Sequence, residues 1–68
     1  MKQVSGKEFS KVLQSMGWEL KRIKGSHHIF LKEGRRERIV VPIHGNSPLK
    51  LGLLKSLMKI AEIEEKDL

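Results

Sequence analysis

The first third of the chain repeats apolar residues every three or four positions, and these are Phe9, Val12, Leu13 and Met16. This spacing is typical of an amphipathic helix. Ser5, with Glu8 three residues later, has the form of a capping box. Gly17 suits the left-handed residue that often follows a helix. The pattern therefore predicts a helix that begins at Ser5 and ends near Gly17.

The middle of the chain contains three short segments that predict strands, at residues 18–23, 27–32 and 38–42. Gly25-Ser26 separates the first two segments, and a turn around Gly34 separates the last two. Connections this short favour antiparallel hairpins. On the first strand, we expect Trp18 and Leu20 to lie on the same, buried side.

A second amphipathic segment follows, whose apolar stripe consists of Leu49, Leu53, Leu54, Leu57, Ile60 and Ala61. Ser47-Pro48 resembles the cap followed by proline that opens many helices. Gly52 weakens the first turn by about 1 kcal/mol relative to alanine, which delays regular helix to about Gly52. The segment 62–68, which is rich in acidic residues, could add one short helical turn.

The order of elements is therefore helix, strand, strand, strand, helix. We expect one α+β domain over residues 1–68, in which both helices cover the same face of an antiparallel three-stranded sheet. The predicted core contains Phe9, Leu13, Trp18, Leu20, Leu54, Leu57 and part of the Ile and Val residues. The other sheet face is left to water or to a partner.

Charge indicates the class of partner. The 68 residues include 14 Lys and Arg against 8 Asp and Glu, a net charge of +6, and the pI is near 10.0. Such an excess attracts polyanions, above all nucleic acid, although an ordinary solvated surface is the alternative. The absence of cysteine excludes disulfides and thiolate chemistry. Without a membrane span or a signal-peptide core, we expect a cytoplasmic protein with no membrane partner.

Two adjacent histidines, His27 and His28, begin the second predicted strand. Histidine exchanges protons near neutral pH, and RNA carries its own nucleophile in the ribose 2′-hydroxyl, so one histidine can act as general base or acid in its cleavage. Neighbours on a strand point to opposite faces, so the pair cannot easily act together. Alternation groups His28 with Phe30 and Lys32 and predicts that His28 is the wetter one. For either histidine, packing at a sheet edge is the alternative.

Phosphate-binding candidates surround the histidines, and these are Lys24, Ser26, Lys32, Arg35, Arg36 and Arg38. The forked donors of arginine match phosphate oxygens, and a solvated hairpin tip is the alternative for each cation. His44, in the loop after the third strand, is a candidate second proton carrier or RNA contact. Adjacent histidines are poor ligands for one ion and no carboxylate stands at a helpful spacing, so we expect no metal and no cofactor.

The sequence Lys-Gly-Ser-His-His-Ile-Phe at 24–30 is followed by Val-Pro-Ile-His at 41–44 and by Leu-Lys-Leu-Gly-Leu-Leu at 49–54. Together with Met16-Gly17-Trp18, these stretches resemble the HicA family of toxins, the small ribonucleases of HicA–HicB toxin–antitoxin modules. The resemblance covers nearly the whole chain. It departs at residues 59–63, which lack a glycine that is usual there.

The resemblance implies a fold like that of double-stranded-RNA-binding domains and metal-independent cleavage of mRNA by a histidine on the second strand. The histidine of the Gly-Ser-His pattern corresponds to His27, whereas alternation along the strand favours His28, so both stay candidates. The resemblance also implies a HicB-like antitoxin that covers the site, and we expect the isolated toxin to be a monomer. A non-catalytic RNA-binding module and a protein that only docks a partner are the alternatives.

Overall fold

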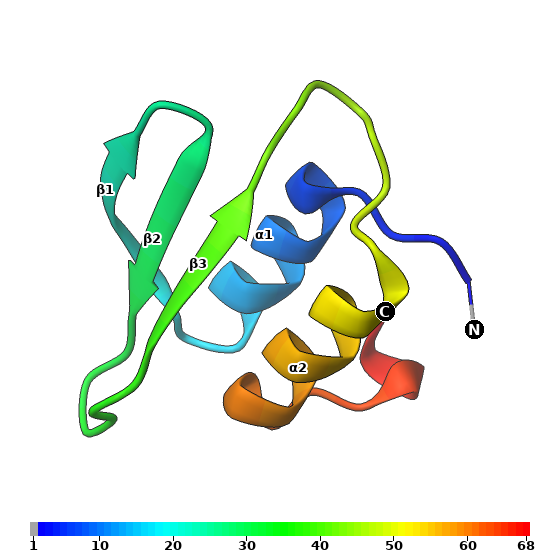
Figure 1. Cartoon of the computed structure of the whole chain (residues 1–68). Helices are drawn as coiled ribbons and strands as arrows, with labels where there is room; N and C mark the ends of the chain where they lie inside the picture. Colours follow the sequence, from blue (N-terminus) through cyan, green and yellow to red (C-terminus); the bar gives the residue numbers. More distant parts are fainter. Residues whose placement is uncertain (1) are drawn as a thin grey trace.

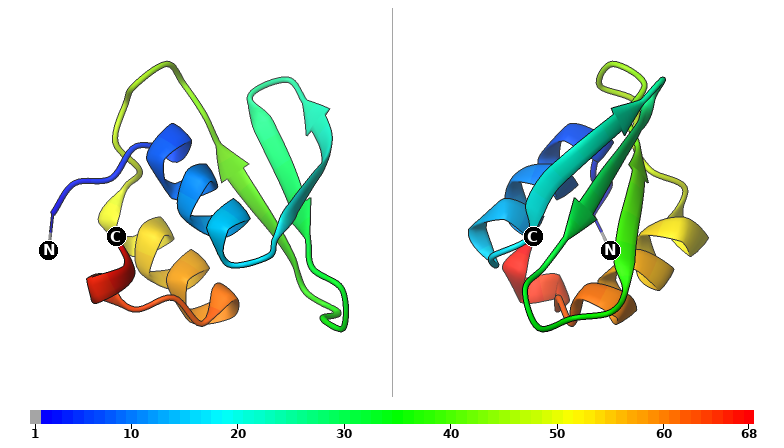
Figure 2. Two further views of the ribbon diagram at one scale, coloured as in Figure 1. Left: turned by 180° about the vertical axis from the view of Figure 1, so that it is seen from behind. Right: turned by 90° about the vertical axis from the view of Figure 1, so that its left-hand side faces the viewer.

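A three-stranded sheet and two helices make up the fold. The computed structural model describes residues 2–68, with elements α1 (Gly6–Ser15), β1 (Glu19–Lys24), β2 (His27–Leu31), β3 (Arg38–Pro42), α2 (Leu51–Ala61) and the short 3-10 helix η1 (Glu65–Asp67). The strands form one antiparallel sheet in the order β1-β2-β3. Both helices lie on the same face of it (Figures 1 and 2), which confirms the predicted order and layers. Within residues 2–68, no helix is long and apolar enough to cross a bilayer.

Helix α1 begins with the predicted capping box. The Oγ of Ser5 accepts a hydrogen bond from the Glu8 N–H at 3.1 Å, and the Glu8 carboxylate accepts one from the Ser5 N–H at 2.9 Å. That bond from the Ser5 backbone holds the pKa of Glu8 below its ordinary value. Because Gly6 has no side chain, the first turn of α1 lies against the end of β3, where a Cβ would stand 2.5 Å from the carbonyl oxygen of Pro42.

The core lies between the sheet and the helices, and its most deeply buried side chains are Val4, Phe9, Leu13, Trp18, Phe30, Ile39, Val41 and Leu54. On β2 and β3, the buried Phe30 and Ile39 face each other in register. The placement of Leu20 in the core is wrong, since this residue is 39% exposed. Leu20 lies on the edge strand β1, which is exposed along all its six residues.

Strand β1 carries a bulge at Lys21. Leu20 pairs with Phe30, whereas Arg22 already pairs with the next residue of β2. One extra residue reverses the alternation of a strand from that point onward. Arg22 and Lys24 therefore face the open side of the sheet, although an unbroken strand would have turned them to the helices together with Leu20.

Helix α2 begins at Leu51, which confirms the expected start of regular helix near Gly52, and not at the cap-then-proline pair. Its N-cap is Lys50, and within residues 2–68 no side chain caps it. Pro48 instead forms a β-bridge with Ser5, and the Leu49 N–H donates to the Val4 carbonyl oxygen at 2.7 Å. The predicted cap at Ser47 is therefore wrong, because this segment pairs with the segment that precedes α1.

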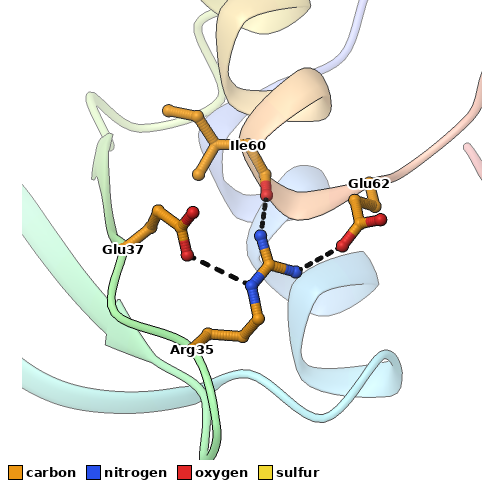
Figure 3. A network of polar contacts seen from close by, with 4 residues as sticks. All are labelled: Arg35, Glu37, Ile60 and Glu62. Carbon is orange, nitrogen blue, oxygen red and sulfur yellow. Dashed lines mark hydrogen bonds and ion pairs between the residues drawn. The ribbon is translucent and has the colours of Figure 1, made fainter.

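Hydrogen bonds of Arg35 hold the β2–β3 connection against the end of α2 (Figure 3). Its guanidinium donates to the Glu37 carboxylate at 3.1 Å, to the Glu62 carboxylate at 2.6 Å and to the Ile60 carbonyl oxygen at 2.8 Å. The hydrogen bond to Glu37 raises the pKa of Arg35. The guanidinium carbon also lies 5.7 Å from the centre of the Trp18 ring, within cation–π range. Groups of the protein itself therefore hold this guanidinium.

Removal of the α1 cap should destabilise the fold. We expect Ser5→Ala to lower the free energy of unfolding by about 1 kcal/mol, measured by urea denaturation. Ser10→Ala is the matched control on the same helix, because the buried Ser10 hydroxyl makes no hydrogen bond within residues 2–68. Loss of an unsatisfied hydroxyl should be neutral or stabilising. Equal losses in the two variants would contradict a specific role for the cap.

Arg35→Ala should loosen the hairpin from α2. We expect the melting temperature to fall by more than about 4 °C, because the variant loses three hydrogen bonds and the contact with Trp18. Arg36→Ala removes an exposed neighbouring cation, and surface changes of this kind shift the melting temperature of a domain of this size by less than about 4 °C. Calorimetry measures both values, and indistinguishable melting temperatures would show that the Arg35 contacts do not stabilise the fold.

Candidate functional site

The structure places His27 and His28 on opposite faces of β2. His28 shares its face with the buried Phe30 and is half-buried between Ile23 and Val41. His27 lies on the open face and is exposed. The prediction that His28 is the wetter histidine is therefore wrong, because Phe30 points into the core and carries His28 to the side of the helices.

Two cations of β1 share the open face with His27. Lys24 on β1 and Pro42 on β3 are opposed to His27 in register, and directly opposed Cα atoms in antiparallel strands lie about 4.5–5.5 Å apart. Arg22 pairs with Ile29, one row further along the same face. The bulge in β1 thus brings an ammonium and a guanidinium to the side of the sheet that carries the exposed imidazole.

Sequence reasoning did not select Arg22 as a candidate. Its orientation depends on the bulge, which strict alternation along β1 does not anticipate. The one local signal is the spacing of the apolar residues Leu20 and Ile23, which are three positions apart and yet lie on the same face. Strands without a bulge space such residues by an even number.

The loop after β3 is bound to the β1–β2 turn. Gly25, with a φ of 61°, makes this two-residue turn possible. The Ile43 N–H donates to the Ser26 carbonyl oxygen at 2.8 Å, and the exposed His44 follows directly. The turn and the loop lie at the same end of the sheet (Figure 1). This end, formed by residues 24–27 and 42–44, is hereafter the histidine end.

The other predicted cations lie at the opposite end of the sheet. Lys32, Arg35 and Arg36 belong to the β2–β3 connection, and Arg38 begins β3; Figure 1 shows this connection far from the β1–β2 turn. Four residue steps along β2 span about 13 Å. Arg38 lies on the open face, opposite Leu31. The predicted phosphate-binding set is therefore divided between the two ends, and Lys24 and Ser26 are its members beside His27.

The chemistry at and beside the histidine end follows from the exposed imidazoles of His27 and His44, the ammonium of Lys24 and the guanidinium of the neighbouring Arg22. A neutral imidazole can accept a proton, while ammonium and guanidinium groups can hold phosphate oxygens. Within residues 2–68, no group of three or more His, Cys, Asp or Glu side chains is placed to hold a metal ion. The arrangement suits proton transfer to or from a phosphate ester that lies on the open sheet face.

A known protein family matches most of the chain. The family described as the HicA toxin of bacterial toxin–antitoxin matches residues 6–63, a range that includes every element from α1 to the end of α2. No curated protein sequence matches the chain. Because the family match covers most of its 68 residues, the chain belongs to the HicA toxin family of bacterial toxin–antitoxin modules.

Proposed function

We propose that this toxin is an endoribonuclease that cleaves mRNA without a metal ion, with His27 as the general base. The observation that carries the proposal is the exposed His27 on the open sheet face, with Lys24 opposed to it in register. The toxin role given by the family match supports it. His28 is the weaker candidate, because it lies half-buried on the side of the helices.

The reaction requires little machinery, because RNA supplies the nucleophile. The neutral His27 imidazole takes the proton of a ribose 2′-hydroxyl, and the 2′ oxygen attacks the adjacent phosphorus. The bond from phosphorus to the 5′ oxygen of the next nucleotide breaks, and that oxygen takes a proton from water at the open face. The products are a 2′,3′-cyclic phosphate and a 5′-hydroxyl end.

Cations on the same face would hold the phosphate and stabilise the charge that develops on it. An RNA strand laid along the open face from the histidine end meets Lys24, then Arg22, then Arg38. Lys32 and Arg36, at the other end of the sheet, add positive potential that attracts the polyanion. Arg35 contributes by holding the hairpin in place, since its guanidinium is bound to groups of the protein.

We further propose that a HicB-like antitoxin covers the open sheet face of the monomeric toxin in the cytoplasm. Ile29 and Val40 are half-buried there, and Leu31 is 39% exposed. This apolar strip, with cations around it, suits a partner whose interface has an apolar centre and an acidic rim. A partner on this face would exclude RNA from His27.

Replacement of each histidine separately tests the catalytic role. We expect His27→Ala to slow RNA cleavage by at least about 100-fold and to relieve growth arrest on expression. Its affinity for RNA should change by less than about threefold, because that change corresponds to only a fraction of the free energy of one charge-assisted hydrogen bond. Cleavage of a labelled RNA by purified protein gives the rates. His28→Ala is the matched control and should keep most of the activity, with thermal melting as a check that it folds.

Three results would change this assignment. Loss of cleavage in a folded His28→Ala alone would move the general base to the other face of β2. Continued degradation of RNA by the double variant would exclude a role for either histidine. A wild-type protein that binds RNA but never shortens it would be a binding module without catalysis.

The two open-face cations of β1 can be tested by the salt dependence of binding. Each phosphate contact on single-stranded nucleic acid contributes about 0.7 to the slope of log K against log salt. We expect the double variant Arg22→Gln and Lys24→Gln to reduce this slope by about 1.4 and to slow cleavage. The matched double variant Lys32→Gln and Arg36→Gln should slow association and leave cleavage of bound RNA nearly unchanged. The reverse order of effects would place the scissile phosphate beside the β2–β3 connection.

A further inference from the structure

A hollow of about 260 Å³ lies beside the histidine end, between the end of β3, the β3–α2 loop and the start of α2. Its apolar walls are Pro42, Pro48, Leu49 and Leu53, and its polar groups come from His44, Ser47 and Lys50. We propose that the hollow binds one unpaired nucleobase, and that the phosphate of this nucleotide lies at the start of α2. This inference rests on the proposed RNA substrate and adds a site that reads one base of it.

The hollow lies next to the proposed cleavage site. Pro42 forms one wall of the hollow and is also the residue of β3 that is opposed to His27. The loop that carries His44 is held to the β1–β2 turn by the hydrogen bond between Ile43 and Ser26. A base in the hollow would therefore belong to a nucleotide close to the scissile bond.

The size and the walls of the hollow suit a flat ring. An apolar cavity of about 150 Å³ holds benzene, so a hollow of about 260 Å³ has room for a nucleobase. Leu49 is 9% exposed and forms the buried part of the wall, while Leu53 is 37% exposed. Bases of single-stranded RNA commonly stack on aromatic rings, imidazole included, and His44 supplies such a ring.

The start of α2 is suited to a phosphate. Lys50 is the N-cap residue and no side chain caps this helix, so the first N–H groups of α2 lack the usual hydrogen-bond acceptor. A helix N-terminus with free N–H groups favours an anion. Gly52 lies in the first turn, and the space that its Cβ would occupy is open, so a phosphate can approach the backbone closely.

The charges around the hollow also indicate which class of ligand it binds. The described residues that line this hollow include no Asp or Glu. A second hollow shares Pro48, Leu49 and Lys50 with the first, and it adds Lys2 and again no carboxylate. An apolar hollow with a histidine, a lysine and an uncapped helix start complements a ligand that is both aromatic and anionic. A nucleotide has both properties, whereas an apolar side chain of a protein partner has only the first.

Titration of the wild-type protein with the four nucleoside 5′-monophosphates, followed by NMR, tests the inference directly. We expect at least one of them to shift the methyl resonances of Leu53, the ring resonances of His44 and the amide resonance of Gly52 together. The corresponding nucleoside should bind at least about tenfold more weakly, because it lacks the charge-assisted contacts. Inorganic phosphate alone should shift the Gly52 amide and leave the Leu53 methyl resonances unchanged.

Two pairs of variants on α2 and its cap sharpen the test. Leu53→Ala and Lys50→Gln should each weaken binding of the monophosphate about tenfold, and Leu53→Ala should also weaken the base preference at the cleavage position. Leu51→Ala and Lys55→Gln replace exposed residues of the same types that do not line the hollow, and they should bind the monophosphate as the wild type does. Because all four positions are exposed, thermal melting should show that all variants fold.

The outcomes separate this inference from the proposed nuclease. If the monophosphates shift only Lys24 and His27 resonances while the wild type cleaves RNA, the base site is wrong and the nuclease stands. If they bind in the hollow and no RNA is ever cleaved, the base site stands and the nuclease is wrong. If they leave the hollow unchanged and Leu53→Ala weakens antitoxin binding instead, the occupant is a protein side chain and the inference is overturned.

Discussion

Phe30 determines the orientation of β2, and through it which side chains of that strand lie on the open face of the sheet. Its ring is 1% exposed and faces Ile39 of β3 across the buried side of the sheet. Alternate residues of a strand point to opposite faces, so an inward Phe30 requires an outward His27. A slip of one residue would expose the ring, with a loss of about 1.5–3 kcal/mol of burial free energy. The core therefore holds the imidazole on the open face.

The two ends of the sheet differ in their contacts with the helices. At the end formed by the β2–β3 connection, Arg35 joins this connection to α2 through Glu37, Glu62 and Ile60. At the histidine end, the exposed side chains make no such contacts with α2, and the bulge in β1 presents cations to solvent. Substitutions of exposed residues at the histidine end can therefore be made without disturbing the contacts that hold the β2–β3 connection.

Most of the fold could be predicted from the sequence, because it depends on local patterns. The capping box at Ser5, the helical spacing of Phe9 and Leu13, and the three strands all follow from neighbouring residues. The errors arise where pairing with another segment decides the outcome: Pro48 pairs with the distant Ser5, and the bulge in the β1–β2 hairpin changes which residues of β1 face outward. The ion pairs of Arg35 belong to the same class, since its acidic and carbonyl partners at the end of α2 are about 25 positions away and leave no local trace. The prediction that His28 is the wetter histidine is wrong because alternation divides the residues of a strand between two faces and does not say which face is buried.

Trp18 gives the protein an optical reporter of its own. It is the single tryptophan of the chain, it is 1% exposed, and its ring lies beneath the guanidinium of Arg35. Indole emission changes with solvent access and with a nearby cation, so the intrinsic fluorescence will report whether the hairpin is closed on α2. Trp18 directly precedes the β1 residue that pairs with Leu31, at the end of the sheet remote from His27. Emission should thus follow unfolding while staying insensitive to a nucleotide bound near the imidazole.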